Sequence, residues 1–340
     1  MTTYPPLLEN SHDDGSKAAI RTLLIFLCMW ETQYHIANLL IQFGLKNYPG
    51  RILDASLFGL LDSAAVSNGG KEIKNENGNG KGNENGSTKS RNEKKSPLDE
   101  AKHTLSRRGP SYLLSFFHSL YATYCGIHHL LSLWNASNLD KLFIPSRDLI
   151  DSYRGAHLQV ATTNTLFLSY LLYDLFHILL QFPKLGGVDT MLHHILFASC
   201  SVINGTYGLM AFPFGWLIIG EGSTIFLNWR WFLLKSGRDG KNKKDTSGGG
   251  GILMDDINRF FAATFFLTRI IFYSIGIVHL FFFSKEELIQ LPEMSGVPKS
   301  LLGLTCACMI LGWGLNMLWG YKIMRMVVGG GKKKGKTKEQ

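Results

Sequence analysis

Ionisable side chains interrupt three consecutive apolar runs between residues 169 and 233 of the chain. Each run is about long enough to cross the hydrocarbon core of a bilayer. A charge within such a segment is costly and faces a bundle interior or an aqueous cavity rather than lipid. We therefore expect these groups to converge on one internal cavity; they are Asp174, His177, His193, His194, Glu221 and Arg230.

The apolar residues of this 340-residue chain gather into segments of about 20 residues, which is the length that crosses the hydrocarbon layer. They predict an all-α transmembrane protein of about seven helices, at residues 18–45, 110–134, 162–182, 191–209, 214–234, 257–283 and 301–323. In a membrane protein, the formal charge of +9 is explained by the excess of Lys and Arg that cytosolic segments carry. No zinc-finger, aromatic RNA-binding or basic-helix pattern indicates a nucleic-acid partner.

Polar segments flank and separate the helices: a tail at 1–17, a Gly/Asn/Lys-rich linker at 63–102 and a basic tail at 326–340. The linker has too few apolar residues to offset the entropy of ordering, so we expect it to be disordered. Lys and Arg are abundant after Ser236 and in the last tail, whereas the segment 205–213 has none. By the positive-inside rule, the linker and the C-terminus are cytosolic and the N-terminus is lumenal.

Two short signals bear on the compartment. The glycosylation sequon at Asn135 falls on the predicted lumenal side, whereas the one at Asn85 falls in the cytosolic linker. Lys336 and Lys338 resemble the dilysine pattern that returns membrane proteins to the endoplasmic reticulum. We therefore expect a multi-pass protein of the endoplasmic reticulum.

Further polar residues extend the predicted lining of the cavity. In the segment 162–182, Tyr170, Asp174, His177 and Gln181 follow one another at steps of four, three and four residues, which places them on one helix face. The full predicted lining is His118, Asp174, His177, Asn228, Arg230, Arg269 and Asn316.

Two arginines in this set invite specific expectations. Arg269 lies deep in its apolar run, so we expect a carboxylate partner, either Glu221 or Asp174. Arg230 stands between two tryptophans at a helix end. It either anchors that helix at the membrane interface or contacts a phosphate of a lipid headgroup or of coenzyme A.

The adjacent histidines His193 and His194 allow two interpretations. They could act as acid/base or acyl-accepting groups in lipid chemistry, close to Glu221 or Asp174. They could instead form a hydrogen-bonded cluster that fixes helix packing. The pattern by itself favours packing slightly.

Metal and transport chemistry are both disfavoured. The His-His pairs at 128–129 and 193–194 lack the histidine boxes of membrane di-iron enzymes, and adjacent histidines on a helix point about 100° apart. The cysteines lie in apolar runs without metal-ligand spacing. No pair of Gly/Pro-broken helices indicates a transporter. We therefore expect no metal and no resident cofactor.

Six stretches carry a family resemblance: SFFHSLYATY, SYLLYDLFHILLQFPKLGG, LHHILFASC, GEGSTIFLNWRWFL, FLTRIIFYS and LNMLWGYKIMR. Together they resemble the TLC-domain family of multi-pass membrane proteins, which includes the ceramide synthases. The pattern is more similar to the TLC-domain-containing protein 4-like branch than to the synthases. The resemblance implies a TLC domain over 110–325, with six helices forming a barrel around an internal cavity open toward the cytosol.

The resemblance also implies site residues. In the synthases the His-His pair is catalytic and carboxylates on the next helix assist; His193 and His194 match the pair, and Glu221 occupies roughly the place of one acid. The synthases' His-Asp-x-x-Asp run is missing, because this chain reads Gly-Glu-Gly-Ser-Thr from Gly220. The linker stands where many synthases carry a homeobox-like domain.

Three functional hypotheses follow. The first is a membrane protein that binds lipid and contributes to membrane lipid homeostasis. The second is a ceramide-synthase-like N-acyltransferase of sphingolipid metabolism, with acyl-CoA as co-substrate, Glu221 orienting the histidines and Arg230 near the coenzyme A phosphates. The third is a trafficking receptor of the endoplasmic reticulum. Membrane lipids are the expected partners, a homo-oligomer is compatible with the pattern, and no residue identifies a protein partner.

Overall fold

The computed structural model describes residues 12–47, 97–143, 150–235 and 249–330. In these ranges the chain is helical almost throughout, and the one β feature is a single antiparallel bridge between Phe143 and Leu209. The prediction of an all-α protein is confirmed. Of the two predicted tails, residues 12–17 belong to α1 and residues 326–330 to α12, so both helices extend into segments predicted as polar tails. The rest of the tails and most of the linker 63–102 lie outside the described ranges, as do Asn85, Lys336 and Lys338.

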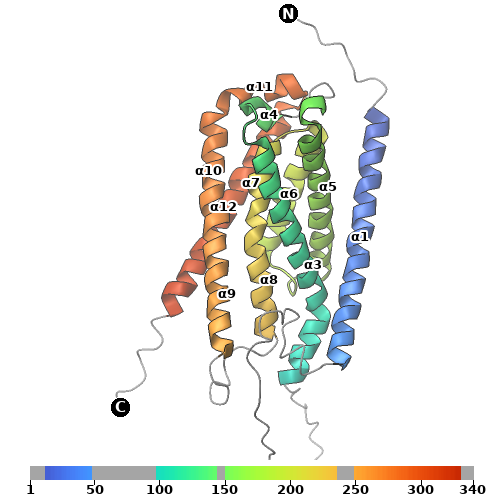
Figure 1. Ribbon diagram of the computed structural model, residues 1–340, viewed down its shortest axis with the longest axis vertical. Helices are drawn as coiled ribbons and strands as arrows, with labels where there is room; N and C mark the ends of the chain where they lie inside the picture. The colour runs from blue at the N-terminus through green and yellow to red at the C-terminus, as the bar shows by residue number, and fades with distance from the viewer. Residues whose placement is uncertain (1–11, 48–96, 144–149, 236–248, 331–340) are drawn as a thin grey trace, which may run out of the picture.

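The described helices line up as seven rods that run up and down one bundle (Figure 1). The first four rods are single helices: α1 (His12–Asn47), α3 (Pro97–Leu133), α5 (Ile150–Leu180) and α6 (Val188–Tyr207). Two rods are interrupted: α7 (Ala211–Ile218), η1 (Ile219–Glu221) and α8 (Gly222–Lys235), then α9 (Gly249–Phe265), η2 (Phe266–Phe272), α10 (Tyr273–Val278) and η3 (His279–Phe283). The last rod is α12 (Lys299–Gly330), and the short helices α4 (Asn138–Leu142) and α11 (Lys285–Ser295) lie at one end of the bundle.

Three helices are long and apolar enough to cross a membrane, at Gln159–Leu180, Met254–Phe283 and Lys299–Arg325. Large apolar side chains point outward on these helices and on their neighbours, including Leu131, Leu179, Ile275 and Leu311. An exposed apolar surface of this extent suits hydrocarbon and not water. The fold is that of a membrane protein.

Helix α3 begins earlier than the sequence predicts. The apolar run indicated a start at Pro110, whereas the helix starts at Pro97, inside the linker predicted to be disordered. Its polar first turns pack on α1: Gln42 donates a hydrogen bond to Ser106, and a Cβ on Gly109 would approach Ile41 Cδ1 to 2.7 Å. The neighbouring helix therefore stabilises turns that local composition does not favour.

The end of the bundle that carries α4 and α11 is closed by packed apolar side chains. The Met210 amide donates to the Leu142 carbonyl at 2.7 Å, which ties the α6–α7 turn to α4. Leu291 of α11 and Val297 are fully buried in the same cluster. This end of the bundle therefore offers no entry to an internal space.

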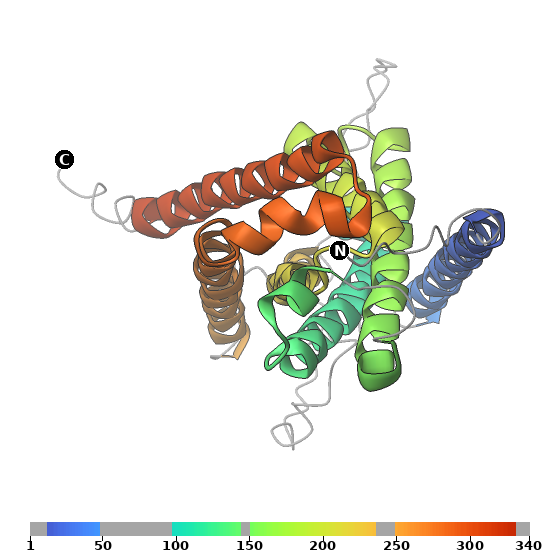
Figure 2. The ribbon, with the colours of Figure 1, turned by 90° about the horizontal axis from the view of Figure 1, so that it is seen from above.

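The α7–α8 rod lies inside the ring formed by the other helices, whereas α1 lies outside it against α3 and α5 (Figure 2). Helix α7 packs closely on α10 at Gly276. A side chain at this position would not fit, because a Cβ on Gly276 would stand 2.6 Å from the Trp216 indole. Helix α12 is tilted and its C-terminal end projects beyond the bundle. A closed six-helix barrel stays a prediction.

Candidate functional site

A cavity of about 690 Å³ lies between six of the rods and reaches the end of the bundle opposite α4 and α11. Residues of α3, α5, α6, α8, α9 with η2, and α12 line it. Its apolar walls include Leu171, Phe261 and Phe265. The same space also receives Asp174, His193, His194, Glu221 and Arg269.

His194 is held at both of its ring nitrogens. Nδ1 lies 2.9 Å from the Thr190 carbonyl oxygen, which can only accept, so Nδ1 donates. Nε2 lies 2.9 Å from Asp174 Oδ2 on α5. One proton is therefore shared between the imidazole and the carboxylate, either as an ion pair or as a neutral pair. The contact joins α5 to α6 across the cavity wall.

His193 is buried but has a free ring nitrogen. Its Nδ1 has no hydrogen-bond partner within the described residues. The ring packs against Phe197 and Trp319, with centroids 4.6 Å and 5.3 Å away. Two adjacent histidines thus differ: His194 is bound to Asp174, whereas His193 lines the cavity with a buried Nδ1 that has no partner within the described residues.

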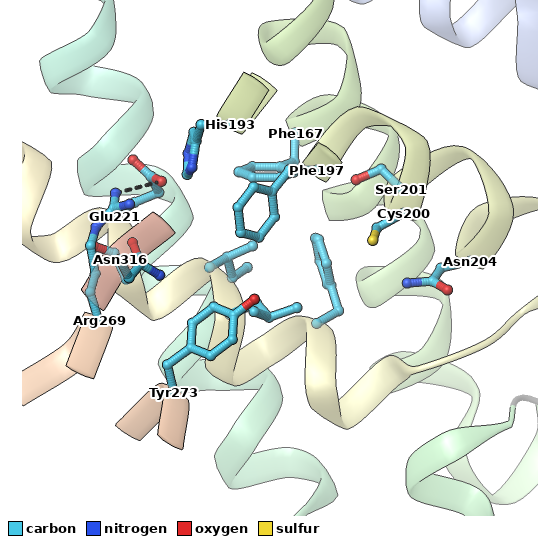
Figure 3. Close-up of a pocket in the computed structure, with 14 residues that line it drawn as sticks. Phe167, His193, Phe197, Cys200, Ser201, Asn204, Glu221, Arg269, Tyr273 and Asn316 are labelled. Carbon is cyan, nitrogen blue, oxygen red and sulfur yellow. Dashed lines mark hydrogen bonds and ion pairs between the residues drawn. The ribbon is translucent and has the colours of Figure 1, made fainter. Parts of the chain in front are cut away.

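Arg269 of η2 is bound by four acceptors from the neighbouring rod, of which Figure 3 shows the Glu221 carboxylate. Its Nη2 donates to Glu221 Oε1 and to Thr224 Oγ1, each at 3.0 Å. Its Nε donates to the Gly220 carbonyl at 3.0 Å and to Ser223 Oγ at 2.9 Å. Of the two carboxylates expected as partners for Arg269, the structure selects Glu221.

Both rods are locally irregular at this contact. The η2 segment is a π-helix, in which an extra residue per turn rotates the side chains that follow. The η1 segment is a single tighter turn that directs Glu221 toward η2. The two irregularities face each other, and together they place the guanidinium against the carbonyl of Gly220 and the Glu221 carboxylate.

A role of Glu221 in orienting the histidines stays a prediction, and the carboxylate that holds His194 is Asp174. Glu221 itself accepts a hydrogen bond from Arg269. The physical reason is the stronger hydrogen-bonding capacity of the guanidinium, which presents five donors to the carboxylate and hydroxyls around it.

Two predicted lining residues contribute to the cavity wall through packing. His118 of α3 is buried, with neither ring nitrogen hydrogen-bonded among the described residues, and its ring stacks on Tyr170 with centroids 3.6 Å apart. Asn228 of α8 donates from Nδ2 to Ser115 Oγ at 3.0 Å and thereby joins α8 to α3. Both residues line the cavity.

His177 does not line the cavity, contrary to the prediction. Its ring stacks on Tyr34 of α1, with centroids 5.1 Å apart, and its Nε2 lies 3.7 Å from Glu31 Oε2. The residue is about 60° around the helix from Asp174. That rotation is enough to direct it to the face of α5 that α1 covers.

Asn316 lines a second, much smaller pocket of about 20 Å³, which is room for one water molecule. This pocket shares Phe167, His193, Glu221 and Arg269 with the main cavity. It continues toward the closed end, with Asn204 at its far side in Figure 3. The amide oxygens of Asn204 and Asn316 are buried without a partner in the part of the chain that the structure describes.

Sequence reasoning missed several contacts of the site. Thr224 and Ser223 bind Arg269, and Asp189 Oδ2 accepts from Trp319 Nε1 at 3.0 Å and lies 3.2 Å from Lys322 Nζ. Asp189 and Lys322 sit near helix ends, where charged residues are common and carry no signal of their own. Among the described residues, no group of three or more His, Cys, Asp or Glu side chains could hold a metal ion.

Comparison with known families gives one match. The family model described as the TLC domain matches residues 111–325. That range contains every residue that lines the main cavity, from Ser111 to Ile323. No curated protein and no solved structure matches the chain.

Proposed function

The chain belongs to the TLC-domain family, and from that premise we propose that it binds a lipid in its central cavity and contributes to membrane lipid homeostasis. TLC domains belong to membrane proteins related to lipids. The observation that carries the proposal is one continuous cavity with both apolar walls and a polar cluster. Its volume of about 690 Å³ lies within the range of small-molecule sites.

The lining of the cavity matches the two parts of an amphiphilic molecule. Leu171, Phe261 and Phe265 offer apolar contact for a hydrocarbon chain. His193 and Thr224 offer hydrogen-bonding groups for a polar head. Because the α4–α11 end is closed by a packed core, the ligand enters from the opposite end or from the side.

The charge pattern of the sequence supports the rest of this proposal. The cavity mouth would face the cytosol, the N-terminus the lumen, and the protein would reside in the endoplasmic reticulum. The Glu-x-Ser-Thr sequence at Glu221 and the single acid at that position support a place in the TLC-domain-containing protein 4-like branch. Membrane lipids are the partners that this function requires.

The experiment compares two tryptophan substitutions on α9. Ala262 lines the cavity, whereas its neighbour Ala263 is exposed on the outer face of the same helix. Ala262→Trp should fill the cavity and reduce the lipid that co-purifies with the full-length protein, as measured by mass spectrometry of extracts. Ala263→Trp is the matched control and should retain wild-type lipid. Equal lipid content in the two variants would contradict the proposal.

An N-acyltransferase is the second candidate, and the position of His193 in the cavity lining favours it. A ring nitrogen of an imidazole can accept the proton of an amine that attacks an acyl thioester, and the thiolate that leaves recovers the proton. The His194–Asp174 pair would hold the adjacent ring in place, and Arg230 would lie near the coenzyme A phosphates. Purified wild-type protein that transfers no acyl group from acyl-CoA to a sphingoid base, while still retaining lipid, would remove this candidate.

A further inference from the structure

The mouth of the cavity carries an arginine that the binding of a hydrocarbon chain does not require. Arg230 of α8 lines the cavity, and its Nε donates to Asn258 Oδ1 of α9 at 2.7 Å. This bond fixes the plane of the guanidinium. Its two Nη groups contact no acceptor among the described residues. Within the part of the chain that the structure describes, they are oriented donors without a partner.

A second cation, Lys322 of α12, lines the same cavity. Its Nζ lies 3.2 Å from Asp189 Oδ2, and the same oxygen accepts from Trp319 Nε1. The indole therefore takes part of the hydrogen-bonding capacity of the carboxylate. An ammonium has three donors and only one is used here, so Lys322, whose side chain is 63% exposed, can also bind a ligand.

We propose that the mouth of the cavity binds the phosphate of a phospholipid or lysophospholipid headgroup, with Arg230 and Lys322 as ligands and the hydrocarbon chain inside the cavity. The inference rests on the proposed lipid-binding function and names the lipid class. A guanidinium matches a phosphate with two parallel hydrogen bonds, which makes arginine the preferred residue for this group. The two cations come from different rods, as a headgroup clamp requires.

Three features favour a lipid over a soluble phosphate compound. The wall beside the mouth is apolar, with Phe261 and Ala262 on α9 and Ile323 on α12. Helix α12 packs mainly on α6 and η2 and its C-terminal end projects away from the bundle, so this wall is shared by two diverging helices. Such an apolar wall contacts a hydrocarbon chain favourably, and a soluble phosphate compound has no chain to place there.

Aromatic residues place Arg230 at headgroup depth. The next residue, Trp231, stacks on Tyr112 of α3 with ring centroids 3.9 Å apart. Trp and Tyr are enriched where the hydrocarbon layer meets water. Arg230 thus lies at the level where the phosphates of surrounding lipids are found.

The test uses full-length protein in phosphatidylcholine nanodiscs and two labelled probes, oleoyl lysophosphatidate and oleoyl glycerol, which differ in the phosphate. Wild type should prefer the phosphate-bearing probe by about tenfold, the contribution of one charge-assisted hydrogen bond. Arg230→Gln should abolish that preference without weakening oleoyl glycerol. Arg259→Gln is the matched control, since Arg259 is 83% exposed and lies outside the cavity lining. Lys322→Gln, at an exposed position, should reduce the preference without affecting folding.

The alternative outcomes separate this inference from the function it rests on. Equal binding of both probes, unchanged in Arg230→Gln, overturns the phosphate site and leaves the lipid-binding function standing. Binding of neither probe overturns both. Displacement of lysophosphatidate by millimolar coenzyme A or inorganic phosphate, with no displacement by phosphatidate, shows a soluble phosphate ligand and overturns the lipid assignment.

Discussion

Two buried charge pairs line the same cavity, and they are built differently. The His194–Asp174 pair joins two regular helices, α5 and α6, through one contact of 2.9 Å. The Arg269–Glu221 pair joins two interrupted rods, and its guanidinium meets four acceptors. The comparison indicates that Arg269 mainly stabilises the bundle, whereas the single contact at His194 leaves the adjacent His193 ring in the cavity lining without a charged partner.

The largest effect is expected from Arg269→Met. The substitution leaves the Glu221 carboxylate buried without its partner, which costs about 3–5 kcal/mol of folding free energy. The thermal unfolding temperature of the purified protein in detergent should fall sharply. The double variant Arg269→Met with Glu221→Met removes both charges and should recover most of the loss. A single variant as stable as wild type would contradict the structural role of Arg269.

A smaller loss is expected from Asp174→Asn. The amide nitrogen of the new side chain can donate to His194 Nε2, but the charge assistance disappears, which costs about 1–2 kcal/mol. The same thermal measurement checks the result against Arg269→Met. If Asp174→Asn destabilised the protein as much as Arg269→Met, the contrast between the two pairs would be lost.

His193→Phe tests whether the histidine pair serves lipid binding and not the stability of the bundle, because the substitution should affect only lipid binding. The ring keeps its packing on Phe197 and Trp319 and no hydrogen bond is lost at Nδ1, so stability should change by less than about 1 kcal/mol. Lipid binding should weaken roughly twofold to tenfold, since one polar contact with the ligand disappears. Titration with a fluorescent lipid measures the binding. Unaltered affinity would show that His193 only packs.

The smallest effect is expected from His177→Gln. This residue lies between α5 and α1, outside the cavity, and its distance to the half-exposed Glu31 is 3.7 Å. A partly solvated contact of this kind contributes about 0.5 kcal/mol or less. The unfolding temperature and the lipid affinity should both stay near wild type. A loss of lipid binding in this variant would contradict the placement of His177 outside the lipid-binding site.

Much of the site could be predicted from the sequence, because a charged side chain in a membrane-spanning segment has to face the interior of the bundle or a cavity. Asp174, His193, His194, Glu221 and Arg269 come from four rods and all line one cavity. Helical spacing and the cost of exposing a charge to lipid were enough to group them. His118, Asn228 and Arg230 line the same space.

Two predictions, the place of His177 and the start of α3, were wrong because they depend on packing against another helix. The spacing of residues along one helix does not show which helix packs on it. His177 shares the stripe of Asp174 on α5, but α1 covers that part of the face. The early start of α3 depends on Ile41 and Gln42 of the same helix α1. The short helices α4 and α11 were not predicted, because they are too short to show an apolar period.

The sequence by itself determined that the chain is an all-α membrane protein and which polar groups must turn inward, because hydrocarbon tolerates neither open backbone groups nor isolated charges. Only the tertiary structure decided which charge pairs with which. Glu221 binds Arg269 because η1 and η2 direct their side chains toward each other, and Asp174 binds His194 because α5 packs against α6. The spacing of residues along one helix contains no information about which helix packs beside it or about a turn in another.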